Sequence, residues 1–113
     1  MSLDYKGTDF YCDVAIPGTI RLEIVHQDSH VLAFHHTKPQ WPVHIVVVPR
    51  RHIPDLVSLA GDTSGILEKL MGVVQVIADK VRRQHGAARI ITNLGTYQDS
   101  KHLHFHIGFG PNL

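Results

Sequence analysis

The sequence contains little of several features that define common protein classes. Its one cysteine, Cys12, excludes an internal disulfide and a cysteine-rich zinc knuckle. The longest purely aliphatic run, Ile45 to Val48, is too short to cross a membrane. A formal net charge of +1 gives no general attraction for nucleic acid or for a membrane surface. The chain also has no phosphate loop of the G-x-x-x-x-G-K type, which argues against that kind of kinase or NTPase chemistry. We therefore expect a soluble cytoplasmic protein.

Histidine is the residue type in excess. The chain has ten histidines against eleven lysines and arginines together. Three of them alternate with apolar residues in the segment His102-Leu103-His104-Phe105-His106-Ile107. This period of two predicts a strand over residues 102–107 with three imidazoles on one face and the apolar side chains facing a core. Three titratable rings on one face are costly to bury without partners, so we expect the functional site here.

The rest of the pattern predicts an α+β fold. Apolar residues at spacings of three and four predict a long helix over residues 67–81, with Ser64 or Thr63 as its cap and Gly86 at its end. The continuous β-branched run 43–48 predicts a central strand that is covered on both faces. We expect an irregular arm over residues 1–19 and a single domain over 20–113. Further strands are expected over 21–27, 31–36 and 88–93, a short helix over 54–59, and a polar loop over 94–101. The order of the elements favours a mainly antiparallel sheet with one long helix across a face.

The three alternating histidines are consistent with three interpretations. His-x-His on a strand with a third histidine is a common zinc-binding arrangement. A neutral imidazole can also attack phosphorus and form a phospho-histidine that water resolves. The third interpretation is a histidine-rich edge strand without a chemical role.

The histidine segment matches the His-φ-His-φ-His-φ signature, where φ is apolar, of the histidine triad (HIT) family of nucleotide hydrolases and transferases. Further segments of the chain resemble other blocks of that family in the right order, over roughly residues 18 to 109: Val31–His35, Pro39, Pro42–His44, Val48–Ile53 and Thr92–Gly95. The resemblance implies about five antiparallel strands with a long and a short helix, and a homodimer formed through the long helix and a sheet edge.

The resemblance also implies a role for individual residues. It makes the chain an enzyme that cleaves a purine nucleotide at its α-phosphorus, and the bond is a phosphoramidate or an anhydride such as that of a dinucleoside polyphosphate. His104 would be the nucleophile, and His106 would hold phosphate oxygens or the bridging atom. His102, His44 and His52 would orient the neighbouring rings. Asn93 would donate to the phosphate or ribose, and Phe34 and Val46 would be walls of a base pocket.

The sequence departs from the family pattern at three places. His36 stands where many members have an acidic residue that holds the ribose hydroxyls, and a histidine cannot replace a carboxylate that accepts two bonds. Asp99, preceded by Gln98, stands where the phosphoramidate-cleaving branch has a serine that assists the leaving group. The Cys-x-x-Cys of zinc-bearing members is absent. We therefore expect no required cofactor and no structural zinc, although Cys12, His52 and His102 could contribute to such a site.

Two other functions remain open from the sequence. One is a three-histidine metal-binding protein or metal-dependent hydrolase, whose activity or stability would be sensitive to chelators. The other is a non-catalytic adaptor that binds nucleotide without turning it over.

Overall fold

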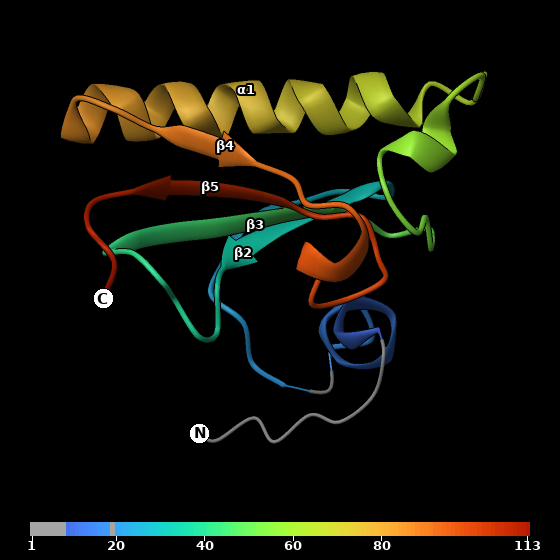
Figure 1. Ribbon diagram of the computed structural model, residues 1–113, viewed down its shortest axis with the longest axis horizontal. Coiled ribbons are helices and arrows are strands. Elements are labelled where there is room, and N and C mark those ends of the chain that lie inside the picture. The colour runs from blue at the N-terminus through green and yellow to red at the C-terminus, as the bar shows by residue number, and fades with distance from the viewer. Residues whose placement is uncertain (1–8, 19) are drawn as a thin grey trace.

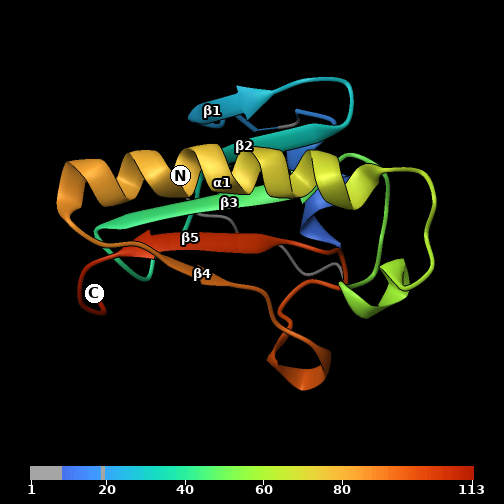
Figure 2. The same cartoon turned by 90° about the horizontal axis from the view of Figure 1, so that it is seen from above.

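The computed structural model describes residues 9–18 and 20–113, which form a five-stranded antiparallel sheet with a long helix across one face (Figure 1). The strand order is β1-β2-β3-β5-β4, which places β3 at the centre (Figure 2). The strands are β1 (Ile24–Gln27), β2 (Val31–His35), β3 (Val43–Pro49), β4 (Arg89–Ile91) and β5 (Phe105–Phe109). The predicted α+β class is confirmed. No helix among the described residues is long and apolar enough to cross a membrane.

The central strand β3 shows why the sequence folds into this sheet. Val46 pairs with Phe34 on β2 and with His106 on β5, so both edges of β3 are hydrogen-bonded. Its valines alternate between two cores: Val47 packs on the side of the long helix, and Val46 packs on the opposite side. A strand that is buried on both faces needs successive apolar residues, as Ile45 to Val48 provide, and His44 is the one polar side chain of the predicted run 43–48.

The long helix α1 (Ile66–His85) covers one face of the sheet with its apolar stripe. The residues of that stripe that the sheet buries are Ile66, Leu70, Val74, Ile77 and Val81. Gly86 ends the helix as predicted, because its φ of +93° is the left-handed conformation that glycine adopts without strain. The predicted cap is wrong: the N-cap is Gly65, with φ +82°, and makes no side-chain bond. Ser64 precedes it and accepts only a long bond, 3.3 Å, from the Ile66 N–H.

The N-terminal segment is not irregular where it is described. Tyr11–Ala15 form a short π-helix, η1, on the sheet face opposite α1 (Figure 1). Tyr11 and Ala15 are buried there in a second core with Phe34 and Val46. The sequence prediction failed because a single turn has too few residues to show a helical period. Residues 1–8 and 19 of the predicted arm lie outside the described residues, and the boundary at residue 20 stays a prediction.

The histidine segment is only partly a strand. β5 begins at Phe105, so His106 lies on the strand, whereas His102 and His104 lie in the segment before it. That segment is bonded differently: the Leu103 N–H donates to the Ile53 carbonyl at 2.6 Å, and the Thr92 hydroxyl donates to the His104 carbonyl at 2.8 Å. The strands β1, β2 and β4 are shorter than the predicted ranges. η2 (Val57–Leu59) is a 3-10 turn within the predicted short helix, and η3 (Gly95–Tyr97) is a 3-10 turn in the predicted polar loop.

Candidate active site

The three histidines of the motif are buried on the sheet face opposite α1. His106 shares a face with its cross-strand partner Val46, which belongs to the second core. His104 lies against Tyr11 of η1, with 5.0 Å between ring centroids. Leu103, Phe105 and Ile107 point the other way, into the core beneath α1. The alternation therefore separates the imidazoles from the main core, as predicted, although only one of them is on the regular strand.

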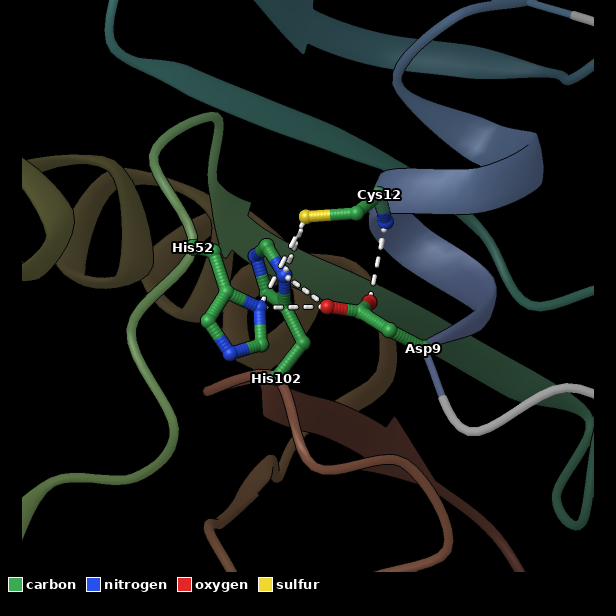
Figure 3. A group of neighbouring side chains, drawn as sticks. All are labelled: Asp9, Cys12, His52 and His102. Atoms are coloured by element: carbon green, nitrogen blue, oxygen red, sulfur yellow. Dashed lines mark hydrogen bonds and ion pairs between the residues drawn. The ribbon is translucent and has the colours of Figure 1, made fainter.

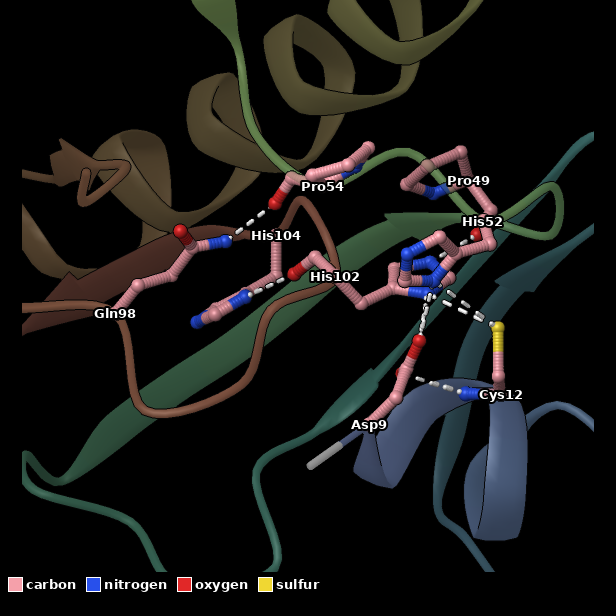
Figure 4. Close-up of polar contacts among 8 residues, drawn as sticks. All are labelled: Asp9, Cys12, Pro49, His52, Pro54, Gln98, His102 and His104. Atoms are coloured by element: carbon pink, nitrogen blue, oxygen red, sulfur yellow. Dashed lines mark hydrogen bonds and ion pairs between the residues drawn. The ribbon is translucent and has the colours of Figure 1, made fainter. Parts of the chain in front are cut away.

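The hydrogen bond of His104 leaves the lone pair of its ring on Nε2. Its Nδ1–H donates to the carbonyl oxygen of His102 at 2.7 Å (Figure 4). A neutral imidazole carries one proton, so the lone pair must be on Nε2. Burial lowers the pKa of His104, while the nearby charges of Asp99 and Asp9 partly oppose the change. His104 is therefore a neutral ring with an available nucleophilic nitrogen.

His106 is held in the opposite sense, with a proton on its outer nitrogen. The Gln40 backbone N–H donates to His44 Nδ1 at 3.0 Å, which leaves the His44 proton on Nε2. His44 Nε2 lies 2.8 Å from His106 Nδ1, so His44 donates and His106 keeps its own proton on Nε2. Burial, followed by neighbouring imidazoles, lowers the pKa of His44 to about 4 and that of His106 to about 3. A backbone amide thus sets the tautomers of two rings in series, and His106 presents a neutral N–H donor.

His36 lies beside these rings. It occupies the position where the sequence departs from the family pattern of an acidic residue. Its ring stacks on His44 with 4.3 Å between centroids, and it lies 6.0 Å from His106. The Lys38 N–H donates to His36 Nδ1 at 2.9 Å, so this ring also carries its proton on Nε2. Burial lowers the pKa of His36. His36 is therefore a single neutral donor, with none of the acceptor capacity of a carboxylate.

Trp41 covers the far side of this cluster. Its ring lies 4.5 Å from that of His44, and its indole N–H donates to Asn112 Oδ1 at 3.0 Å. The ring packs directly on Gly108 of β5, where a Cβ would come within 2.4 Å of it. Only glycine can stand at this position without moving the tryptophan.

The first histidine of the motif belongs to a different cluster, formed by Asp9, Cys12, His52 and His102 (Figure 3). Their ligand atoms all lie within 4.8 Å of one another. Asp9 Oδ2 is 2.5 Å from His52 Nδ1 and 3.2 Å from His102 Nδ1, and Cys12 Sγ is 3.2 Å from His102 Nδ1. We call this set the Asp–Cys–His–His cluster. It brings together the three residues that the sequence named as possible zinc ligands and adds Asp9.

In the Asp–Cys–His–His cluster His102 presents a lone pair, whereas the His52 Nδ1–H donates to Asp9 Oδ2, so a metal would have to displace that proton. His102 donates its Nε2–H to the Pro49 carbonyl at 2.8 Å, so the lone pair on Nδ1 faces Asp9 and Cys12. Burial would raise the pKa of Asp9, but bonds from Cys12 and the proximity of His102 lower it, which keeps this carboxylate ionised. Burial and the carboxylate together raise the pKa of the Cys12 thiol to about 11. One carboxylate, one sulfur and two imidazoles that face a common point form a donor set that suits zinc.

A second group of three rings, His36, His44 and His106, has a similar spacing but fits a metal poorly. Metal binding needs a lone pair on the nitrogen that faces the ion, and His36 and His44 carry protons on those nitrogens. Binding there would break the bonds from the Lys38 and Gln40 amides. Among the described residues, His104 belongs to neither group. The three motif histidines are therefore divided between two environments and do not form one three-histidine metal site.

The predicted nucleotide-binding residues surround the histidines at different distances from the surface. Phe34 and Val46 are almost fully buried in the second core, with Phe34 against Tyr11. Asn93 is half-buried just after β4, next to the Thr92 hydroxyl that holds the His104 carbonyl. Gln98 is buried and donates its amide to the Pro54 carbonyl at 2.6 Å, which attaches the 94–101 loop to the segment after β3 (Figure 4).

Two predicted residues of the site lie at its open side. Asp99 is exposed, and its charge raises the pKa of both His36 and His104 relative to burial alone. His36 lines a surface pocket of about 310 Å³, near the lower end of the range of roughly 300–1,000 Å³ found for ligand pockets. Its lining residues are Ile20, Arg21, Leu22, Glu23, His35, His36 and Thr37.

Sequence reasoning missed Asp9, Tyr11 and the backbone amides of Gln40 and Lys38. Asp9 could have been found, because Asp9-x-x-Cys12 has the spacing of the expected Cys-x-x-Cys with one ligand type exchanged. The backbone amides have no signal in the sequence, since their role depends on how the 36–44 loop folds.

The chain is similar to known proteins over most of its length. The family model described as HIT domain matches residues 18–109. A purine nucleoside phosphoramidase of Escherichia coli is 34% identical over 97 residues, covering 80% of this chain and 78% of the relative. An uncharacterised HIT-like protein of Buchnera aphidicola is 33% identical over 100 residues, covering 87% of this chain and 89% of the relative. The structure of a histidine triad protein from Clostridium difficile superposes with a TM-score of 0.77 at 32% identity, covering 96% of each chain.

Proposed function

Because the chain belongs to the HIT domain family, we propose that it is a nucleotide hydrolase or nucleotidyltransferase acting at the α-phosphorus of a purine nucleotide. The observation that carries this proposal is the pairing of opposite tautomers: a lone pair on His104 Nε2 beside an N–H on His106 Nε2. The two rings are perpendicular, with 4.8 Å between centroids. A nucleophile and a donor side by side are what displacement at a phosphoryl group requires.

The proposed reaction has two displacements. His104 Nε2 attacks the α-phosphorus, the bond to the leaving group breaks, and a nucleotidyl-histidine forms. The leaving group departs with the electron pair and takes up a proton from solvent. The bond from His104 Nδ1–H to the His102 carbonyl stabilises the positive charge that the ring acquires. Water then attacks the phosphorus and loses a proton to solvent, the N–P bond breaks with its electron pair returning to Nε2, and the nucleoside monophosphate leaves with His104 restored. His106 Nε2–H donates to a phosphoryl oxygen or to the bridging atom in both steps.

We assign the remaining substrate contacts by their position around His104. The nucleoside would extend past His36 into the pocket of about 310 Å³, with Asn93 on the phosphate or ribose side. Phe34 and Val46 would support the base pocket from below. Asp99 at the open edge would face the leaving group, where an acid suits an amine better than a polyphosphate. The substrate is accordingly a phosphoramidate first and a dinucleoside polyphosphate second, a preference supported by the name of the Escherichia coli relative.

The test is AMP release from adenosine 5′-phosphoramidate by the unmodified protein and by His104→Ala, each with and without EDTA. We expect turnover that persists in EDTA to within about tenfold and falls by at least about four orders of magnitude in His104→Ala. His85→Ala on the exposed end of α1 is the matched control and keeps full activity. Loss of turnover in EDTA alone would instead favour a metal-dependent hydrolase. Nucleotide binding without turnover in any sample would favour the adaptor.

A second proposal concerns a metal with a structural role. The Asp–Cys–His–His cluster supports zinc binding by Asp9, Cys12, His52 and His102, contrary to the expectation from the sequence. Bound zinc would hold η1 to the end of β3 and to the His102 segment, and would add no group to the reaction itself. The measurement is metal content after purification, compared between the unmodified protein and Asp9→Ala. We expect about one zinc per chain in the first and a strongly reduced content in the second.

We also propose a homodimer in the cytoplasm. Apolar side chains remain exposed on α1 and along the β4 edge, including Val76, at 71% exposure, and Ile90, at 52%. The free thiol of Cys12 is consistent with a reducing compartment. Light scattering after gel filtration is the test: a dimer mass is expected, and Val76→Glu with Ile90→Glu should give the monomer.

A further inference from the structure

A second pocket lies on the other side of the sheet from the histidines. Its volume is about 250 Å³, and it is lined by Ser29, His30, Arg51, Ser64, Ile66 and Lys69. Ile66 belongs to the core between α1 and the sheet, whereas the partner of His106, Val46, belongs to the opposite core. The pocket is therefore separate from the proposed catalytic site. We call it the basic pocket.

A chain of hydrogen bonds orients three of its polar groups. Lys69 Nζ lies 3.2 Å from His30 Nε2, and because an ammonium can only donate, the His30 lone pair is on Nε2. The His30 proton is then on Nδ1 and is donated to Ser29 Oγ at 2.9 Å. The Ser29 hydroxyl keeps its own hydrogen for a ligand, and Lys69 keeps two N–H donors. The chain of hydrogen bonds thus has a donor at each end.

The charge of the basic pocket is positive. No carboxylate lies within ion-pair distance of Lys69 in the part of the chain that the structure describes. Arg51 is paired with Asp62, but the distance is long, 3.4 Å, and engages one of five N–H donors. The Ser64 hydroxyl is also bonded to Asp62, so this carboxylate is already shared on its other oxygen. Two cations therefore line the pocket and no carboxylate does; Asp62 is bonded to Arg51, and Asp28 accepts from the His30 backbone N–H.

We propose that the basic pocket binds a phosphate group, as inorganic phosphate or as the terminal group of a small phosphomonoester. The oxygens of a phosphate dianion can accept from all three types of donor: the Lys69 ammonium, the Arg51 guanidinium and the Ser29 hydroxyl. The volume lies below the range of roughly 300–1,000 Å³ for sites that take a whole drug-sized ligand, which favours a small anion over a complete nucleotide. This proposal is independent of the reaction assigned to His104.

The experiment is a titration of the ¹⁵N-labelled protein with inorganic phosphate at constant ionic strength, followed by NMR. The titration uses the variant His104→Ala. This substitution weakens phosphate binding at the proposed catalytic site, so that the shifts report on the basic pocket. We expect saturable shifts of the Ser29, Ser64 and Lys69 amides. Lys69→Ala and Arg51→Ala should each weaken the affinity by at least roughly tenfold, because each removes a charged donor to the phosphate, while Lys80→Ala on the same helix should not change it.

A parallel titration with ribose 5-phosphate distinguishes the two sources of the phosphate. Tighter binding than that of inorganic phosphate would identify a phosphomonoester, and equal binding would identify the free ion. Shifts that do not saturate, or that persist unchanged in both Lys69→Ala and Arg51→Ala, would overturn the proposal. Retained chemical-shift dispersion in both variants verifies that they are folded.

Discussion

Two clusters of histidines lie close together in this protein, and they differ in which ring nitrogen carries the proton. In the first, the amides of Gln40 and Lys38 donate to Nδ1 of His44 and His36, so the protons lie on the nitrogens that face the cluster. In the second, the Asp–Cys–His–His cluster, His102 donates its Nε2–H to a carbonyl, so a lone pair faces inward. Both clusters have ligand atoms within 4.8 Å, and distance alone does not distinguish them.

This difference shows that the hydrogen-bond partner of one ring nitrogen decides whether the other nitrogen is a hydrogen-bond donor or a metal ligand. A backbone N–H on that nitrogen makes the inner nitrogen a donor, suited to a phosphoryl oxygen. A carbonyl on that nitrogen makes the inner nitrogen a ligand, suited to zinc. His104 follows the second arrangement, since its Nδ1–H donates to a carbonyl and its Nε2 keeps a lone pair, as the proposed nucleophile requires. Variants of these rings test the distinction.

The largest expected effect is a loss of stability in acid. The pKa of His44 is lowered to about 4 and that of His106 to about 3, whereas an unfolded histidine titrates near 6.5. Between these values the unfolded chain binds more protons than the folded chain, so stability falls as the pH decreases from about 6.5 toward 4. Each ring contributes a slope of up to about 1.4 kcal/mol per pH unit. Urea unfolding at several pH values measures it.

The matched variants for this experiment are His44→Gln and His85→Gln. Removing His44 should reduce the slope below pH 6.5, whereas removing His85, which is exposed at the end of α1, should leave it as it was. Equal slopes in the unmodified protein and His44→Gln would show that the buried cluster accepts protons freely, and the donor assignment would then be wrong.

The next effect is on catalysis, through His44. His44→Phe removes the bond that fixes the tautomer of His106, and we expect kcat to fall by about 10²-fold, comparable to the loss of one transition-state donor. His44→Gln should recover part of the rate, because its amide N–H can donate to His106 Nδ1. Steady-state kinetics with adenosine 5′-phosphoramidate provide both values. If His44→Gln is as slow as His44→Phe, then donation to His106 is not what His44 contributes.

How much of this was available from the sequence depends on the kind of interaction. The β-branched run 43–48 predicted the central strand, and the spacing of Leu70, Val74 and Ile77 predicted α1, because burial repeats along a regular element. The alternation of His102, His104 and His106 predicted which side chains leave the main core. These are local patterns. The structure confirms the central strand and α1, whereas the predicted histidine strand begins only at Phe105.

What the sequence could not provide depends on contacts across long separations. The division of the three motif histidines between two environments depends on Pro49 and Gln40, which lie in other parts of the chain. The spacing of Asp9 and Cys12 could have indicated a shared site, but their placement beside His102 depends on a turn of helix, η1, that no period reveals. Tautomers follow from these bonds, so the chemistry of each ring is a property of the fold and not of the motif.

Zinc binding by the Asp–Cys–His–His cluster should stabilise the folded protein by an amount that depends on the concentration of free zinc. If zinc binds only the folded chain, stability rises by about 2.7 kcal/mol when free zinc reaches one hundred times its dissociation constant. Thermal unfolding with and without EDTA measures this gain. Asp9→Ala should lose most of this gain. Asp13→Ala, which removes an exposed carboxylate of η1, should retain it. If the melting temperature of the unmodified protein does not respond to zinc, the four side chains form a hydrogen-bonded cluster and not a zinc site.

The smallest expected effect concerns sugar recognition at His36. A neutral ring with one N–H can make one bond to a ribose hydroxyl, whereas a carboxylate can accept from both hydroxyls. We therefore expect the unmodified protein to discriminate weakly between adenosine and 2′-deoxyadenosine phosphoramidates. His36→Asp adds one acceptor bond worth about 1 kcal/mol, which should raise the ratio of kcat/KM for the two substrates about fivefold. Both absolute values should fall, because a second carboxylate near Asp99 repels the phosphate. His35→Asp controls for that charge, and an unchanged ratio in His36→Asp would mean that position 36 does not face the sugar.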